Sequence, residues 1–144
     1  MHALDLSRLN ILLLDDSRSI RVVLKTLLRG LGVSRIYESR DSEEALVTAR
    51  LSRPDLVLVD HDLGSASGLD AVRRFRDPAH SPDTGLPIIF LAPPCLPHLG
   101  RAAEGAGADA VLPKPVNAAT LGQRIDQLMR PGLRCADPAV SRSA

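Results

Sequence analysis

Short apolar runs separated by polar stretches recur along the chain. The runs at 11–14, 56–59, 88–92 and 110–112 contain only apolar residues. An apolar run of this length without alternation is typical of a strand that is covered on both faces, as in a parallel sheet. A weaker run at 33–37 predicts one more short strand. The pattern therefore predicts five strands.

The segments between the strands have helical spacing. Ser17 can cap a helix that Gly30 or Gly32 ends. Asp41 and Glu44 have the spacing of a capping box, which predicts a second helix. The apolar positions that form the stripe of the first helix are Ile20, Val23, Leu24, Leu27 and Leu28.

Three more helices are predicted further along the chain. Leu69, Val72 and Phe75 mark the first, and residues 96–106 form the second. The last is capped by Asn117 and carries the stripe Leu121, Ile125 and Leu128. From residue 131 the sequence loses its periodicity. We therefore expect one domain over 1–130 and a flexible C-terminal tail over 131–144.

Strands that alternate with helices predict an α/β fold. The expected architecture is a three-layer α/β/α sandwich around a five-stranded parallel sheet, because crossovers of this length are right-handed and place helices on both faces. The strand order predicted for it is 2-1-3-4-5, which is flavodoxin-like.

Composition and charge narrow the function. The chain is 44% hydrophobic but has no Trp, one Tyr and two Phe, so its core is aliphatic. Its formal net charge is +1 and its Lys and Arg residues form no cluster, which argues against a nucleic acid or an anionic membrane as partner. The apolar runs are too short to span a bilayer, and the first ten residues lack a signal sequence, so a cytoplasmic location is expected.

Acidic residues and one lysine follow the predicted strands. Asp15 and Asp16 follow the first strand, Asp60 the third, and Lys114 the fifth. In an open parallel sheet these strand ends border the ligand site. Two carboxylates about 4 Å apart repel each other by roughly 4 kcal/mol at an effective dielectric constant of about 20, so a counter-ion is needed. Mg²⁺ suits such an oxygen site, and a carboxylate beside it can attack a phosphoryl group whose charge a lysine neutralises.

The order and spacing of these motifs resemble the receiver domains of bacterial two-component response regulators, including stand-alone receivers of the chemotaxis-regulator type. The resemblance covers about residues 9–130. The motifs that carry it are Asp15-Asp16, the run Pro54 to Asp60, Gly68, Pro87-Ile88-Ile89, and Gly107-Ala108-Asp109 leading to Lys114-Pro115.

The resemblance implies a site and partners. Asp60 would accept a phosphoryl group from a histidine kinase or a histidine phosphotransfer protein. Mg²⁺ would be bound by Asp15, Asp16, Asp60 and the backbone carbonyl of Asp62, with Asp16 the direct ligand of the acidic pair. Lys114 would contact the phosphoryl oxygens, and the bond to the Pro that follows it would be cis. The chain would act through contact with a downstream protein that the sequence does not identify, rather than as an enzyme, and homodimer formation is left open.

Several positions depart from the family pattern. Ala92 stands where Thr or Ser normally contacts the phosphoryl group, and Val111 where an aromatic residue normally turns inward. Gly64 and Ser67 replace the usual Pro and Asp in the loop after Asp60. The acceptor residues are retained, whereas the hydroxyl and aromatic switch is degenerate.

Two other functions are therefore considered. One is a degenerate receiver that binds a partner without being phosphorylated, which Ala92 and Val111 favour. The other is a small phosphohydrolase with an aspartyl-phosphate intermediate, which the Asp60-His61-Asp62 sequence resembles. His61 is expected to be a rim residue beside the acceptor, and the Asp62 side chain is expected to be exposed.

Overall fold

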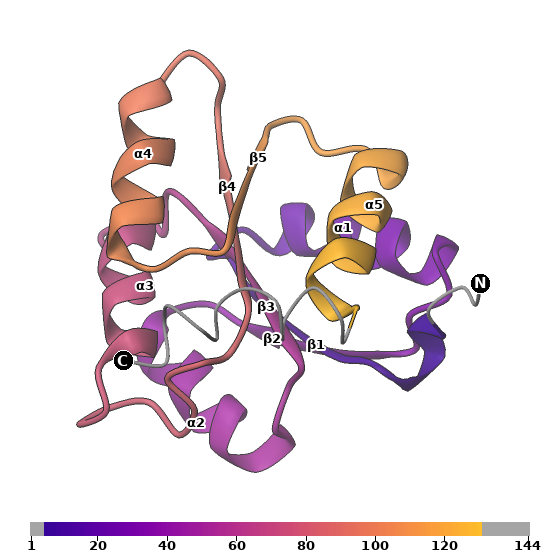
Figure 1. The fold of residues 1–144 in the computed structure, drawn as a ribbon, viewed down its shortest axis with the longest axis horizontal. Coiled ribbons are helices and arrows are strands. Elements are labelled where there is room, and N and C mark those ends of the chain that lie inside the picture. Colours follow the sequence, from indigo (N-terminus) through magenta and orange to yellow (C-terminus); the bar gives the residue numbers. More distant parts are fainter. Residues whose placement is uncertain (1–4, 131–144) are drawn as a thin grey trace.

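Within residues 5–130, which the computed structural model describes, five parallel strands form one sheet in the order β2-β1-β3-β4-β5 (Figure 1). The strands are β1 (Asn10–Leu14), β2 (Arg35–Ser39), β3 (Leu56–Asp60), β4 (Ile88–Ala92) and β5 (Ala110–Pro113). The helices are α1 (Arg18–Gly30), α2 (Ser42–Ser52), α3 (Gly68–Arg76), α4 (Pro97–Ala106) and α5 (Ala118–Met129), preceded by a 3-10 turn, η1 (Leu6–Arg8). The predicted tail at 131–144 lies outside the described residues.

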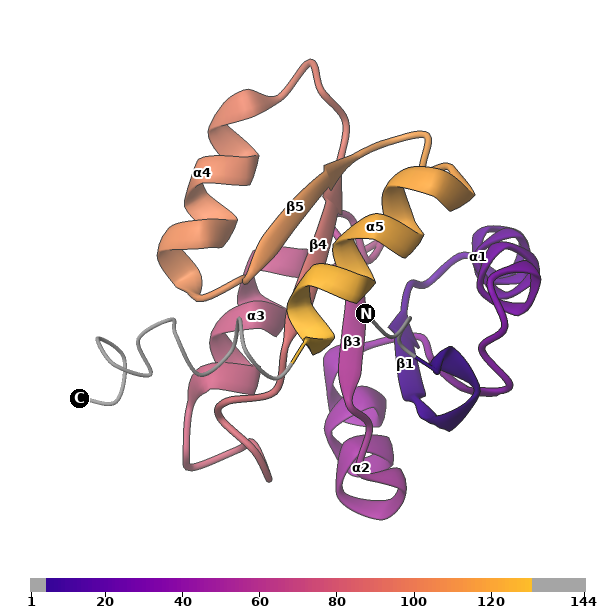
Figure 2. The ribbon, with the colours of Figure 1, turned by 45° about the vertical axis from the view of Figure 1, so that its right-hand side comes forward.

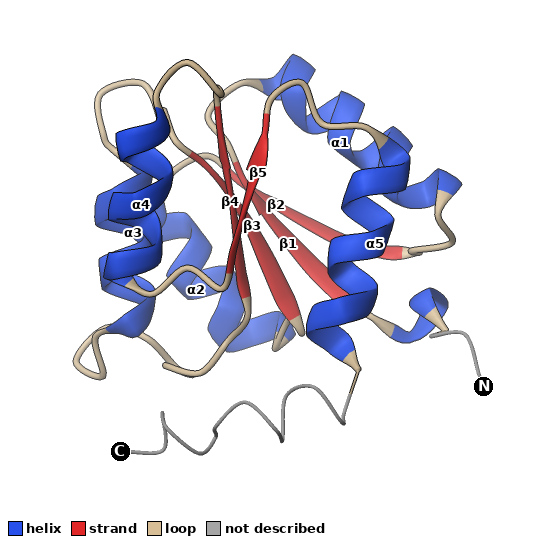
Figure 3. Cartoon of the chain, turned by 45° about the horizontal axis from the view of Figure 1, so that its top comes forward, coloured by secondary structure: helices blue, strands red, loops and turns tan. Residues whose placement is uncertain are grey.

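The helices cover both faces of the sheet. Figure 3 shows α1 and α5 on one face and α2, α3 and α4 on the other. Alternate residues of β3 enter the two cores, since Val57 and Val59 pack with the α2–α4 side whereas Leu56 and Leu58 pack with the α1–α5 side. At the sheet edge, β5 lies between α4 and α5 (Figure 2). The predicted α/β/α sandwich and its strand order are confirmed.

The predicted helix caps are confirmed. The Ser17 hydroxyl accepts the N–H of Ile20 at 3.3 Å. Asp41 accepts the N–H of Glu44 at 2.9 Å, and Asn117 caps α5 through the N–H of Thr120 at 2.9 Å. Each side chain satisfies a backbone donor that the first turn of a helix leaves free.

The predicted stripe of α1 is partly wrong. Leu24 and Leu28 are buried, but Ile20 is 38% exposed and Val23 is 53% exposed. Arg21 is buried instead, at 8% exposure. Compared with the predicted stripe, the buried face of α1 is turned so that a charged residue lies inward. The fold tolerates this buried charge because it is paired, as described below.

The second strand begins two residues later than predicted. Val33 is buried, but its N–H donates to the carbonyl of Leu28 at 3.0 Å. Gly32, with φ +104°, makes the left-handed turn that ends the helix. Val33 therefore belongs to the C-terminal cap of α1, and the strand runs over Arg35–Ser39 rather than 33–37.

Among residues 5–130, no helix is both long enough and apolar enough to cross a membrane.

Candidate functional site

The carboxyl edge of the sheet brings an acid from β3 to a lysine that follows β5. The Lys114 ammonium donates to Oδ1 of Asp60 over 2.7 Å. The side chain of Asp60 is 5% exposed and that of Lys114 is 29% exposed. The pair is thus shielded on the Asp60 side and open to solvent on the Lys114 side.

The second oxygen of Asp60 is held by the loop that follows β3. Its Oδ2 accepts the backbone N–H of Asp62 at 3.0 Å. A one-residue bridge between Asp62 and Ser67 closes this loop. Its two hydrogen bonds, which run from Leu63 N–H to Ala66 and from Gly68 N–H to His61, do not use the Asp62 carbonyl. The Asp62 side chain is exposed, as predicted.

Asp15 lies next to this pair and is 2% exposed. Its Oδ1 accepts the N–H of Ser17 at 2.9 Å, whereas its Oδ2 is buried without a hydrogen-bond partner. Burial is the largest cause that raises the pKa of Asp15, to about 6, and the negative charges of Asp60 and Asp16 add to it. The Ser17 hydrogen bond and the charge of Lys114 act in the opposite direction. The site therefore contains a buried carboxylate oxygen that lacks a hydrogen-bond partner.

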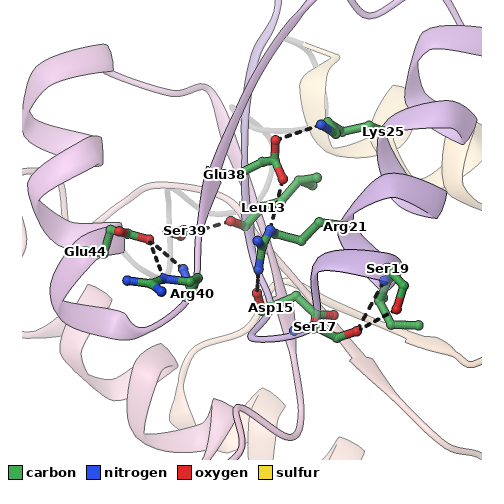
Figure 4. A network of polar contacts seen from close by, with 11 residues as sticks. Leu13, Asp15, Ser17, Ser19, Arg21, Lys25, Glu38, Ser39, Arg40 and Glu44 are labelled. Carbon is green, nitrogen blue, oxygen red and sulfur yellow. Dashed lines mark hydrogen bonds and ion pairs between the residues drawn. The ribbon is translucent and has the colours of Figure 1, made fainter.

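The main chain of Asp15 is held by a network of charged residues on α1 and β2 (Figure 4). Arg21 donates from Nη1 to the Asp15 carbonyl at 2.6 Å and from Nε to Glu38 at 2.9 Å. Lys25 donates to the other Glu38 oxygen at 2.8 Å, and the Asp15 N–H donates to the Ser39 carbonyl at 3.1 Å. The hydrogen bond from Lys25, followed by that from Arg21, lowers the pKa of Glu38 against the opposing effect of partial burial. The hydrophobic pattern along the chain contains no sign of this role of Arg21.

Asp16 is exposed and approaches the loop after β3 at Gly64. A Cβ at position 64 would lie 2.6 Å from Oδ2 of Asp16, which is closer than atoms can pack. Gly64 also has φ +79°, in the left-handed region that favours glycine. The departure from the family pattern at this position thus makes room for the Asp16 carboxylate.

A metal ion at this edge would have few protein ligands. Over residues 5–130, no three His, Cys, Asp or Glu side chains gather closely enough to hold a metal by themselves. Mg²⁺ does not need such a cage, because it retains several waters and uses one or two carboxylates. The buried, unpartnered Oδ2 of Asp15 and the adjacent Asp16 carboxylate fit that requirement.

The two switch positions lie on β4 and β5. Ala92 is 4% exposed, and its carbonyl accepts the N–H of Lys114 at 3.0 Å. The Lys114–Pro115 bond is cis, as the resemblance implies. Val111 is partly buried against α4, where a Cβ at Gly100 would lie 3.2 Å from its Cγ1. Neither position carries a polar side chain.

His61 lies beside the acceptor and is partly exposed, as expected for a rim residue. Its Nδ1 is 3.6 Å from Oδ1 of Asp60, and its side chain is 19% exposed. The Nδ1 atom is buried without a hydrogen-bond partner. Its position directly after Asp60 was the one sequence signal for this proximity.

Comparisons with known proteins show the family to which the chain belongs. The model of the response regulator receiver domain matches residues 11–126. The chain is 31% identical over 121 residues to the KDP operon transcriptional regulatory protein KdpE of Escherichia coli. The matched region makes up 84% of this chain but only 51% of KdpE. It is 28% identical over 128 residues to the chemotaxis protein CheY-3 of Vibrio cholerae, with 89% of this chain and 97% of that protein covered.

One similar solved structure holds a metal ion. The receiver domain of the sensor histidine kinase PA1611 of Pseudomonas aeruginosa is 32% identical and superposes with a TM-score of 0.70, covering 83% of this chain and 95% of that domain. That domain was crystallised with a magnesium ion coordinated in its active site cleft.

Proposed function

This chain belongs to the response regulator receiver domain family, and on that premise we propose that it accepts a phosphoryl group on Asp60. The observation that carries the proposal is the 2.7 Å contact between Lys114 Nζ and Asp60 Oδ1, beside the buried carboxylate of Asp15. Asp60 closes β3, Lys114 follows β5, and Asp15 has an oxygen, Oδ2, without a hydrogen-bond partner. Together they can hold an anionic group with its counter-ion at the carboxyl ends of the strands.

The proposed step is the transfer of a phosphoryl group from a phosphohistidine of a kinase or phosphotransfer protein. A carboxylate oxygen of Asp60 forms a bond to phosphorus as the P–N bond of the donor breaks. The electron pair of that bond returns to the donor imidazole, which leaves as a neutral ring once solvent protonates it. Lys114 then exchanges its contact with the Asp60 carboxylate for one with the phosphoryl oxygens.

Mg²⁺ is proposed as the cofactor, with Asp15, Asp16, Asp60 and the Asp62 carbonyl as its protein ligands. When bound, it would offset the negative charge shared by the carboxylates and the phosphoryl group. The fixed Asp15 main chain and the room that Gly64 leaves for Asp16 support this assignment. The role as a signalling module, with a downstream protein as its target, would place the chain in the cytoplasm.

Acetyl phosphate with Mg²⁺, followed by intact mass measurement, tests the proposal. We expect the full chain to gain one phosphoryl group and Asp60→Asn to gain none. Asp70→Asn is the matched control, because this carboxylate on α3 is 69% exposed and pairs only with its helix neighbour Arg73 among the ion pairs described. It should be phosphorylated as readily as the unchanged chain.

Ala92 and Val111 favour a second candidate, a receiver that binds its partner without phosphorylation. The absence of any mass gain at millimolar Mg²⁺, together with unchanged partner binding by Asp60→Asn, would support that alternative. Sustained turnover of small phosphate esters would instead indicate a phosphohydrolase. Either result would overturn the proposed acceptor role.

A further inference from the structure

His61 has an unused hydrogen-bonding atom at the candidate site. Its Nδ1 is shielded from water, has no hydrogen-bond partner, and lies 3.6 Å from Oδ1 of Asp60. A polar nitrogen removed from water without a new partner destabilises the folded state. A buried polar atom without a partner calls for an explanation, and a catalytic role is one such explanation.

The backbone of His61 is held on both sides, so its position relative to Asp60 is set by the fold. Its N–H donates to the carbonyl of Leu91 at 2.9 Å, and its carbonyl accepts the N–H of Gly68 at 2.9 Å. The first residue of α3 packs directly on this backbone, since a Cβ at Gly68 would collide with the Asp60 carbonyl and lie 2.9 Å from the His61 Cα. The imidazole is therefore attached to a rigid part of the chain.

Two nitrogens lie beside the same oxygen of Asp60. Lys114 Nζ is 2.7 Å from Oδ1, and His61 Nδ1 is 3.6 Å from it. A phosphoryl group on this carboxylate brings negatively charged oxygens that need donors. The end of β4 offers no donor from its side chain, because Ala92 presents only a buried methyl group. His61 is the donor adjacent to the acceptor that makes no other hydrogen bond through its Nδ1.

We propose that His61 donates a hydrogen bond from Nδ1–H to an oxygen of the phosphoryl group on Asp60, and is thus a catalytic residue of this receiver. The proposal rests on the proposed function, since it requires a phosphoryl group on Asp60. The contact forms no covalent bond and transfers no proton, because a neutral ring with its hydrogen on Nδ1 is sufficient. Lys114 neutralises charge on the group, and His61 adds a directional donor.

The test uses beryllofluoride with Mg²⁺ on the full chain, because beryllofluoride mimics a phosphoryl group on a carboxylate. His61→Leu removes the donor, whereas His61→Asn retains an N–H near the place of Nδ1. The control is His80→Leu. His80 lies in the α3–β4 loop, at the amino ends of the strands and away from the candidate site, and it pairs with Asp77 at 2.9 Å. Binding is followed by amide NMR, together with the ¹⁵N resonance of the His61 Nδ1.

We expect His61→Leu to bind beryllofluoride about tenfold more weakly than the unchanged chain, as for the loss of one hydrogen bond to a charged group. His61→Asn should lose about threefold or less, and His80→Leu should match the unchanged chain. In the unchanged chain the Nδ1 resonance should shift on binding, as expected for a nitrogen that becomes a hydrogen-bond donor.

Two results separate this proposal from the proposed function. If the unchanged chain binds beryllofluoride but His61→Leu binds within about twofold of it, or the Nδ1 resonance does not move, the His61 contact is wrong and the acceptor role stands. If the unchanged chain binds no beryllofluoride and gains no phosphoryl mass, both are wrong. Should His61→Leu fail to fold in a thermal unfolding measurement, the Nδ1 resonance of the unchanged chain decides.

Discussion

Replacing Asp15 by Asn is expected to stabilise the folded protein at neutral pH when no divalent cation is present. Burial raises the pKa of Asp15 to about 6 from the ordinary value of 3.8. A carboxyl with a raised pKa binds its proton more tightly in the folded state than in the unfolded chain. Its favourable contribution is complete below pH 3.8 and is lost as the pH rises through about 6.

The size of the effect follows from the structure. One pKa unit corresponds to about 1.4 kcal/mol, so ionised Asp15 costs the folded state about 3 kcal/mol at neutral pH. Asn keeps the oxygen that accepts the Ser17 N–H, but it places an amide NH₂ where Oδ2 is buried without a partner. That group costs about 1 kcal/mol, which leaves a net gain of about 2 kcal/mol.

Urea denaturation with a chelator measures this difference. At about pH 8 we expect Asp15→Asn to be about 2 kcal/mol more stable than the unchanged chain, and at about pH 3 about 1 kcal/mol less stable. Added Mg²⁺ should stabilise the unchanged chain more than the variant, and so reduce the difference at high pH. A difference in the free energy of unfolding that stays constant between these pH values would refute the reasoning.

Two further substitutions test how the acidic residues are positioned. Arg21→Gln should lower the free energy of unfolding by about 2 to 3 kcal/mol, because the Asp15 carbonyl and Glu38 lose a buried charged donor. Lys25→Gln, which removes the other partner of Glu38, should lower it by about 1 kcal/mol or less. Equal losses of the two variants in urea denaturation would contradict this. Gly64→Ala should weaken Mg²⁺ binding about threefold or more in an NMR titration, because the added Cβ meets the Asp16 carboxylate. Gly30→Ala, which has open space around its Cβ, should bind Mg²⁺ as the unchanged chain does. An unaltered affinity in Gly64→Ala would show that Asp16 does not need this space.

The inner strands could be predicted from the sequence because they are buried on both faces. A short continuous apolar run such as Leu56–Val59 is typical of a strand in that position. The edge strand β2 has no such run. Its start was predicted two residues too early, because the buried Val33 belongs to the cap of α1 and not to the strand. Hydrophobic periodicity also misplaced the face of α1. Periodicity is read from apolar residues alone, so it does not show that Arg21 donates to Glu38 and to a carbonyl oxygen in the interior.

The site was predictable to the level of strand ends. Parallel topology alone requires Asp15, Asp60 and Lys114 to meet at one edge, and the structure places Lys114 Nζ against Asp60. Finer features depend on backbone angles and ring orientation that emerge only from the whole fold. The space at Gly64 and the buried nitrogen of His61 are of this kind.

The close packing of Gly100 on Val111 has a consequence for how this domain can vary. Helix α4 approaches β5 so nearly at this point that a methyl group at position 100 would need the valine to yield by a few tenths of an ångström. The two positions are therefore epistatic, and the effect of an aromatic residue at 111 depends on what stands at 100. A mutational scan that changes one position at a time would miss the pairs of residues that repack together.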